Sequence, residues 1–330
     1  MRVAARPTER FFYGWVIVLV GAVLTFLGTG FYSYSRGVFL PSLAEELAGG
    51  SRFEIAMGFS IAAVTSALVA PFIGGILDKY SPKTVILVGI GFVTGSYLLL
   101  SFCQNLIQFY LIVGLGMGLG MTCMGNLAWH RTIISWFDHW RGRAISLGVL
   151  GASLAGVVMP PLVTSLVEAI GWRSAFVVFA IIVPSILIPL VIYFLKNRPE
   201  EIGEVRDGHV YSEAHKTTEV EDQTESRIWH WKEMIRFPAF WSIGLMFGAM
   251  GCVYSAVMLH LFGHLTDIGL PGSEAAYILS ATALFAALGK PVVGWMSDFF
   301  GARVTIWMAL LFQATSLIPV SYTHLTLPTN

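Results

Sequence analysis

The chain has 330 residues, of which 55% are hydrophobic and only 12% are charged, and its formal net charge is zero. Soluble globular proteins carry about 25% charged residues, so this chain has too few charges to cover a soluble surface. A neutral chain also gives no electrostatic reason to expect a nucleic-acid partner. Cys103, Cys123 and Cys252 all lie in apolar runs, which excludes a disulfide framework and a cysteine metal site. The composition predicts an all-α membrane protein with no metal and no cofactor.

The chain contains nine apolar stretches, each long enough to cross a bilayer as a helix, which takes about 20 residues. The first follows a basic N-terminus and is longer than the core of a signal peptide, which is about 7–15 residues. The breaks between stretches carry charged residues, Gly or Pro; one of them runs from Pro41 to Arg52. The stretches cover residues 13–34, 55–77, 84–102, 107–130, 144–167, 174–195, 239–262, 273–296 and 304–319.

The basic residues are distributed unevenly over the connections between these stretches. With the N-terminus in the cytoplasm, most of the 20 Lys and Arg residues fall in cytoplasmic segments. Only Arg36, Arg52 and Arg173 fall on the outer side, and Lys290 lies inside the eighth stretch. Short loops rich in Lys and Arg remain in the cytoplasm. We therefore expect a multi-pass protein of the cell membrane (inner or plasma membrane) with a cytoplasmic N-terminus.

The apolar stretches fall into two groups separated by a polar segment. Residues 196–237 are rich in charge and poor in apolar runs, which is typical of a flexible linker. We predict a six-helix bundle over residues 1–195, a cytoplasmic linker over 196–237, and the first three helices of a second bundle over 238–319. Residues 320–330 resemble a translated sequencing adaptor, and we exclude them from the fold.

A motif at the end of the second stretch recurs at the end of the eighth. Residues 74–83 read GGILDKYSPK and residues 294–303 read GWMSDFFGAR. Both copies place Gly first, Asp four positions later and a basic residue five positions after the Asp. Because the copies follow the second helix of each group, they indicate a parallel repeat of six helices, an architecture found in transporters.

This motif resembles the signature loop between helices two and three of the major facilitator superfamily, Gly-x-x-x-Asp-(Arg/Lys)-x-Gly-x-(Arg/Lys). Ser81 replaces the family's second Gly in the first copy, and Phe299 replaces a basic residue in the second. The resemblance implies a major facilitator fold of twelve helices, of which nine are present here, and a role of the loop in conformational gating. The gating residues would be Gly74, Asp78, Lys79, Lys83, Gly294, Asp298, Gly301 and Arg303.

Shorter pieces are similar to the branch that contains monocarboxylate transporters and oxalate:formate antiporters. These pieces are Tyr13-Gly-Trp15, Trp136-Phe137 with Arg141-Gly142, Pro160-Pro161, and the run RPEEIG from Arg198 to Gly203. The resemblance implies a secondary active transporter that moves a small, monocarboxylate-like organic anion by alternating access. With three helices of the second bundle expected beyond this sequence, the polypeptide as printed is not expected to transport.

Lys290 is the charged residue that lies deepest in an apolar stretch, about 12 Å along the helix from Asp298 at 1.5 Å per residue. Charged side chains inside the bilayer are costly and mark solute or ion pathways. In the monocarboxylate carriers that the chain resembles, an Arg-Pro pair at this position binds the substrate carboxylate; here the pair is Lys290-Pro291. Lys keeps the charge but lacks the two-pronged guanidinium. A snorkelling side chain or a structural ion pair is the alternative.

The other candidate substrate-binding residues are polar groups in or beside the stretches. Arg36 lies near the outer end of the first stretch, where the related carboxylate carriers have a Lys; an ordinary interfacial Arg is the alternative. His260 could titrate near neutral pH or be an ordinary interfacial His. Tyr32, Asn126 and Tyr254 could line a polar pocket or make ordinary hydrogen bonds between helices.

The apolar stretches contain no deeply placed Asp or Glu, which favours an anionic solute over the alternative, a drug or multisolute exporter. An enzyme is not expected, because acid–base or ligand clusters are missing, and a membrane sensor is less favoured because the linker is short and polar. We expect as partners a small carboxylate solute, with H⁺ symport or counter-anion antiport both open, and the lipid bilayer. We expect no nucleic acid, and a monomer.

Overall fold

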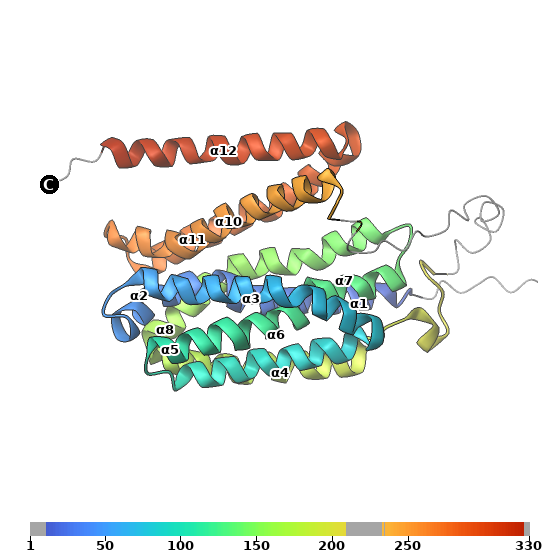
Figure 1. Cartoon of the computed structure of the whole chain (residues 1–330), viewed down its shortest axis with the longest axis horizontal. Coiled ribbons are helices and arrows are strands. Elements are labelled where there is room, and N and C mark those ends of the chain that lie inside the picture. The colour runs from blue at the N-terminus through green and yellow to red at the C-terminus, as the bar shows by residue number, and fades with distance from the viewer. Residues whose placement is uncertain (1–10, 209–232, 234, 327–330) are drawn as a thin grey trace, which may run out of the picture.

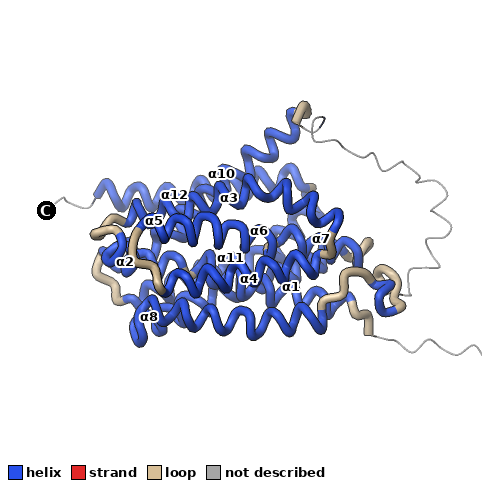
Figure 2. The backbone as a smooth tube through the Cα atoms, turned by 60° about the horizontal axis from the view of Figure 1, so that its bottom comes forward, coloured by secondary structure: helices blue, strands red, loops and turns tan. Residues whose placement is uncertain are grey.

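The computed structural model describes residues 11–208, 233 and 235–326. Within these residues the chain forms helices and loops and no strand (Figures 1 and 2), which confirms the predicted all-α class. The first half contains α1 (Gly14–Thr29), the π-helix η1 (Gly30–Tyr34), α2 (Arg36–Leu47), α3 (Arg52–Lys79), α4 (Pro82–Ser101), α5 (Leu106–Phe109), the π-helix η2 (Tyr110–Met117), α6 (Gly118–Met124) and α7 (Asn126–Trp136). The remaining elements are α8 (Arg141–Phe194), the 3₁₀ turn η3 (Pro199–Ile202), α10 (Pro238–Asp267), α11 (Gly272–Phe300) and α12 (Ala302–Thr326).

All nine predicted stretches fall on helices within the described residues. By length and composition, seven described helices are suited to crossing a membrane. That number takes α8 as one helix and does not include α12. Gly171, with φ 75° and ψ 161°, breaks α8 into two arms. A residue with a side chain rarely adopts a positive φ, so Gly171 permits the turn between the fifth and sixth stretches.

The first membrane helix is longer than the sequence predicts. We expected a break from Pro41 onward, but α2 continues through Pro41 to Leu47. Pro lacks only its own N–H group, and membrane helices tolerate it because neighbouring groups satisfy the freed carbonyl. The irregularity lies earlier, in the π-helical turn η1 between α1 and α2. Single π-helical turns within helices are frequent at functional sites.

Elements α1 to α8 share one continuous core. α8 packs against α1 and α4, and α3 packs against η2 and α6. A Cβ added at Gly151 would lie 1.9 Å from the carbonyl oxygen of Ala22, so α1 and α8 touch backbone to backbone. Small residues allow such close approach between membrane helices. Trp129 fills the neighbouring space between these two helices and is 1% exposed.

The first part of the predicted linker docks on the core. The Glu204 carboxylate accepts a hydrogen bond from the backbone N–H of Tyr13, at 3.1 Å. The Asp207 carboxylate accepts from the backbone N–H groups of Asp138 and His139, at 2.8 and 2.7 Å. The indole of Trp136 donates to the carbonyl of Lys196. The residues from Lys196 to Gly208 therefore form ordered structure, while 209–232 and 234 of the predicted linker lie outside the described residues.

The helix bundle has two ends, which we name by residues. The Arg52 end holds the turn between α2 and α3, and the Asp78 end holds the turn between α3 and α4. α11 packs against α8, and α10 packs against α2 and η1. Figure 1 shows α10 running obliquely across the bundle, with one end near α2. α12 packs on α11 and continues to Thr326. Of the predicted adaptor residues, 327–330 lie outside the described residues.

Candidate functional site

Arg36 lies where α2 meets α10. It is the first residue of α2, directly after the π-helical turn η1 and Ser35. Its Nη2 lies 3.5 Å from the carbonyl oxygen of Ser255 on α10, and its guanidinium lies 5.8 Å from the ring centre of Tyr32. Its Nε is buried and has no hydrogen-bond partner among the described residues. An unpartnered buried N–H is costly and can be satisfied by a water or a ligand.

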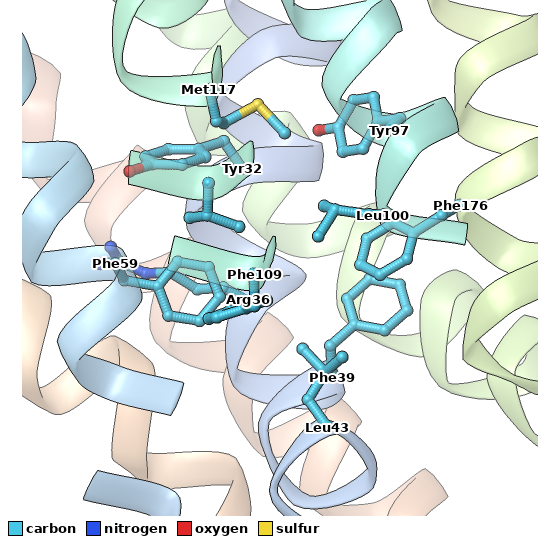
Figure 3. Close-up of a pocket in the computed structure, with 11 residues that line it drawn as sticks. Tyr32, Arg36, Phe39, Leu43, Phe59, Tyr97, Leu100, Phe109, Met117 and Phe176 are labelled. Atoms are coloured by element: carbon cyan, nitrogen blue, oxygen red, sulfur yellow. The ribbon is translucent and has the colours of Figure 1, made fainter. Parts of the chain in front are cut away.

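A small cavity, which we call the Arg36 pocket, adjoins this guanidinium (Figure 3). Its free volume of about 20 Å³ is enough for one water molecule. Apart from Arg36 the walls are aromatic or aliphatic. The pocket is lined by Tyr32, Arg36, Phe39, Leu43, Phe59, Tyr97, Leu100, Phe109, Val113, Met117 and Phe176.

A pair of tyrosines joins η1 to α10 beside Arg36. The Tyr254 hydroxyl donates to the Tyr34 hydroxyl, at 3.0 Å. The Tyr34 ring lies against Gly156 of α8, where an added Cβ would come within 2.6 Å of it and within 2.4 Å of Ala283 on α11. η1, α8 and α11 therefore meet at Gly156, and α10 joins them through the Tyr254–Tyr34 hydrogen bond. The structure places Tyr254 beside Tyr34, and Tyr34 was not among the predicted residues.

Lys290, like Arg36, is a basic residue that joins two helices; it connects α11 to α8. Its Nζ donates to the Oγ of Ser153 on α8 and lies 3.5 Å from the carbonyl oxygen of Val149. Ser153 is 1% exposed and lies one helical turn before Gly156. Arg36 thus reaches from α2 to α10, and Lys290 reaches from α11 to α8. We call the α2–α10 and α8–α11 contacts together the interface.

Two predicted residues do not join this group. His260 is exposed on α10. Asn126 is exposed at the start of α7, after Gly125 interrupts the α6–α7 helix with ψ −164°. Their predicted roles remain untested, and only Tyr32, Arg36, Tyr254 and Lys290 lie at or beside the interface.

The first copy of the repeated motif makes contacts within the first part of the chain. The Asp78 carboxylate pairs with Arg131 of α7 at 2.6 Å. The backbone N–H of Lys83 donates to the Asn197 side chain, and its ammonium donates to the carbonyl of Ile192. A Cβ added at Gly74 would meet none of the described atoms within 4 Å. Lys79 is exposed at the end of α3.

The second copy lies at the junction of α11 and α12. Gly301 connects the two helices with φ 80°, which accounts for the Gly at this position. Arg303 is exposed in the first turn of α12. The surroundings of Gly294 and of the Asp298 side chain lie outside the described residues, so the gating role of this copy remains a prediction.

Ser81, the departure from the family motif, has a structural explanation. Its Oγ accepts a hydrogen bond from the backbone N–H of Thr84, at 3.2 Å, and so caps the N-terminus of α4. Pro82 occupies the first position of that helix, where a missing N–H has no consequence. Ser is among the best residues at such a cap, and Gly is only slightly worse.

Ion pairs at the Arg52 end were missed at the sequence level. Arg52 at the start of α3 forms a two-pronged ion pair with Asp267 at the end of α10, with one contact at 2.7 Å. Glu46 accepts hydrogen bonds from the side chains of Arg173 and Trp172, which joins α2 to the second arm of α8. Each partner is far away in sequence, so no local pattern signals the pair.

The described residues include no group of three or more His, Cys, Asp or Glu side chains that could hold a metal ion. The basic and aromatic groups at the interface could hold an anion without a cofactor. The positively charged Arg and Lys side chains bind a negatively charged ligand strongly, and tyrosine hydroxyls can donate hydrogen bonds to it.

The profile of the Major Facilitator Superfamily matches residues 23–329. The chain is 23% identical to the uncharacterized MFS-type transporter YcxA of Bacillus subtilis, covering 94% of this chain and 72% of the relative. It is 25% identical to monocarboxylate transporter 13 of Bos taurus, covering 94% and 68%.

The fold is similar to a solved structure of a bacterial homologue of the human lysosomal transporter Spinster, in an inward-facing and unoccupied conformation. The TM-score is 0.60 at 16% identity, and the match covers 91% of this chain and 64% of that one. At this identity the likeness concerns the fold alone. The profile match extends over most of the sequence and agrees with the all-helical structure. The chain therefore belongs to the major facilitator superfamily, a family of membrane transporters and not of enzymes.

Proposed function

We propose that this protein is a secondary active transporter of a small organic anion with a carboxylate group, and that it works by alternating access. The carboxylate would bind between Arg36 and Lys290, on the surface where α2 and α8 face α10 and α11. In transporters built from repeats, the substrate site lies at the interface between the repeats.

The observation that carries this proposal is the position of the two basic side chains. Arg36 reaches from α2 to the Ser255 carbonyl of α10, and Lys290 reaches from α11 to Ser153 of α8. Each cation contacts only neutral oxygen atoms in these bonds, so each can accept an anion as a stronger partner. The likeness to a monocarboxylate transporter supports a carboxylate as that anion.

The contacts of α10 support one state of the alternating-access cycle. Its buried residues are confined to the last third of the helix, at the Arg52 end, and its first two thirds are mostly exposed. With the N-terminus in the cytoplasm, as the charge distribution predicts, the Arg52 end faces outward. We therefore propose a state that is closed at the outer end.

The test is uptake of radiolabelled lactate, pyruvate, oxalate and formate by liposomes that contain the protein expressed from its complete reading frame. Charge-assisted hydrogen bonds contribute about 1.5–3 kcal/mol each, so Lys290→Ala and Arg36→Ala should each lower the uptake efficiency about tenfold or more. Lys290→Arg should retain part of the activity, and Arg143→Ala, which changes an exposed arginine, should retain all of it.

Two outcomes would count against the proposal. If folded protein takes up none of the four acids, the substrate is not a small carboxylate, and an exporter of other solutes becomes the better proposal. If uptake occurs but is unchanged in both Lys290→Ala and Arg36→Ala, the carboxylate does not bind between these two residues.

A further inference from the structure

The π-helical turn η1 lies between two close contacts of the first membrane helix. At Gly30 an added Cβ would come within 2.8 Å of Ala155 and of Met159, both on α8. At Gly37 an added Cβ would come within 2.8 Å of the carbonyl oxygen of Met258 on α10. In an unbroken α-helix these two glycines would be about two turns apart and would lie on one face. The π turn holds about one residue more than an α-helical turn, so it moves Gly37 about 100° around the helix axis.

The Ser35 side chain bonds back to the first residue of this turn. Its Oγ donates a hydrogen bond to the carbonyl oxygen of Gly30, at 3.0 Å, and the side chain is fully buried. Donor and acceptor residues have the i to i+5 spacing of a π-helix. In an α-helix a serine instead reaches a carbonyl three or four positions before it, as Ser96 of α4 does with Phe92. The bond from Ser35 to Gly30 therefore belongs to the π-helical form of η1.

The residues on either side of Ser35 both reach α10. The Tyr34 hydroxyl accepts a hydrogen bond from Tyr254, and the Nη2 of Arg36 lies 3.5 Å from the carbonyl oxygen of Ser255. If η1 became α-helical while α1 stayed against α8, each later residue would take about the angular position that the next residue has now. Arg36 would then turn about 100° away from its present place on α10.

We infer that Ser35 is a positioning residue for the proposed anion site. Its hydrogen bond to Gly30 stabilises the π-helical form of η1, and this form directs Arg36 toward α10. Ser35 acts through the helix and does not contact the solute. The inference rests on the proposed function for the role of Arg36, whereas the effect of Ser35 on the turn is measurable without transport.

The first experiment measures the face of α2 by thiol labelling, in protein expressed from its complete reading frame without native cysteines. Ala44 is 2% exposed, whereas its neighbour Glu45 is exposed. N-ethylmaleimide should therefore label Glu45→Cys faster than Ala44→Cys. Adding Ser35→Ala should raise the labelling rate of Ala44→Cys about two- to tenfold, because the loss of a neutral hydrogen bond shifts an equilibrium by about that factor. In the α-helical form residue 44 takes the exposed position of residue 45.

The second experiment measures pyruvate uptake in liposomes. Ser35→Ala should raise the KM about two- to tenfold with a smaller change in kcat, because only the fraction in the π-helical form binds the anion. Deleting Ser33 from this variant removes the extra residue of the turn, so α2 regains its present face in α-helical form. The deletion should bring both the labelling order and the KM back toward wild type. A variant that only folds poorly would not be rescued by a deletion.

Ser96→Ala is the matched control. It removes the hydroxyl of another buried serine, 3% exposed, whose bond to Phe92 has the α-helical spacing. It should change neither the labelling order in α2 nor the KM.

Three results would overturn the inference. They are an unchanged labelling rate of Ala44→Cys with Ser35→Ala, an equal change with Ser96→Ala, and a Ser33 deletion that does not restore the labelling order. If the wild type takes up no carboxylate, the proposed function fails. The labelling experiment still decides whether Ser35 holds the turn, so the two failures are distinguishable.

Discussion

The two ends of α10 meet different surroundings. At the Arg52 end, Met258, Leu259 and Phe262 are buried against α2 and its neighbours. Toward the Asp78 end, Trp241, Leu245 and other large apolar residues of the same helix are exposed. Both halves are apolar, so composition does not distinguish them. The difference lies in the surface that each half faces.

Small residues and one ion pair account for the contact at the Arg52 end. A Cβ added at Gly37 would lie 2.8 Å from the carbonyl oxygen of Met258, so α2 and α10 approach to backbone contact. The Arg52 guanidinium packs over Gly263 and pairs with Asp267. At the Asp78 end of α3, Gly74 has no such neighbour within the described residues. A glycine therefore specifies a close helix contact only where another helix lies against it.

The largest effect should come from filling the space at Gly37. Gly37→Val should push α10 away from α2, because overpacking costs about 1–3 kcal/mol. Gly244→Val, on the exposed half of α10 where an added Cβ would meet none of the described atoms within 4 Å, is the matched control and should leave the chain close to wild type. Thermal unfolding in detergent measures stability, and the distance between spin labels at Phe53→Cys and Ile268→Cys reports the opening, on a background without native cysteines. Equal effects of the two valines would refute the difference between the ends.

The next effect concerns the Arg52–Asp267 pair. Both side chains are partly exposed, at 35% and 53%, and exposed ion pairs contribute about 0.2–1 kcal/mol. Arg52→Glu places two carboxylates together and should raise the population of molecules with a longer distance between the same spin labels severalfold. The double variant Arg52→Glu with Asp267→Arg should restore the short distance. If the swap does not restore it, the pair does not hold this end closed.

An effect of similar size is expected at the Asp78 end, from the cap of α4. Ser81→Ala removes the hydrogen bond to the Thr84 N–H and should destabilise the protein by about 1 kcal/mol. Ser81→Gly, which restores the residue of the family motif, should cost only a few tenths of a kcal/mol. Denaturation in mixed detergent measures both. A cost of Ser81→Gly as large as that of Ser81→Ala would show that the cap is not the reason for Ser81.

The smallest expected effect is a difference in labelling rate between the native thiols. Cys252 lies on the exposed half of α10, whereas Cys103 is 1% exposed, and burial raises the pKa of the Cys103 thiol. Because the thiolate is the reactive form, N-ethylmaleimide should label Cys252 before Cys103. A cysteine at Met258, in the buried half of α10, should label more slowly than Cys252 on the same helix. Equal rates at these two positions would remove the distinction between the halves of α10.

The sequence predicted the features that depend on local composition. Apolar stretches of about 20 residues locate the membrane helices because the bilayer leaves no other partner for the backbone. The repeat of residues 74–83 at 294–303 indicated the family, which the profile match confirms. Lys290 stood out because charge inside a membrane helix is rare, and Arg36 because the carboxylate carriers that the chain resembles have a Lys in this region. These inferences need no knowledge of which helices are neighbours.

The tertiary structure decided which side chains meet. Tyr34 with Tyr254, Lys290 with Ser153, and Arg52 with Asp267 are each separated by more than a hundred residues. Nearly every helix is apolar on all sides, so the sequence carries little sign of which face turns inward. The residues that line the Arg36 pocket likewise come from seven separate elements. Helix packing brings these groups together, and packing depends on the shapes of both partners, which no single stretch of sequence contains.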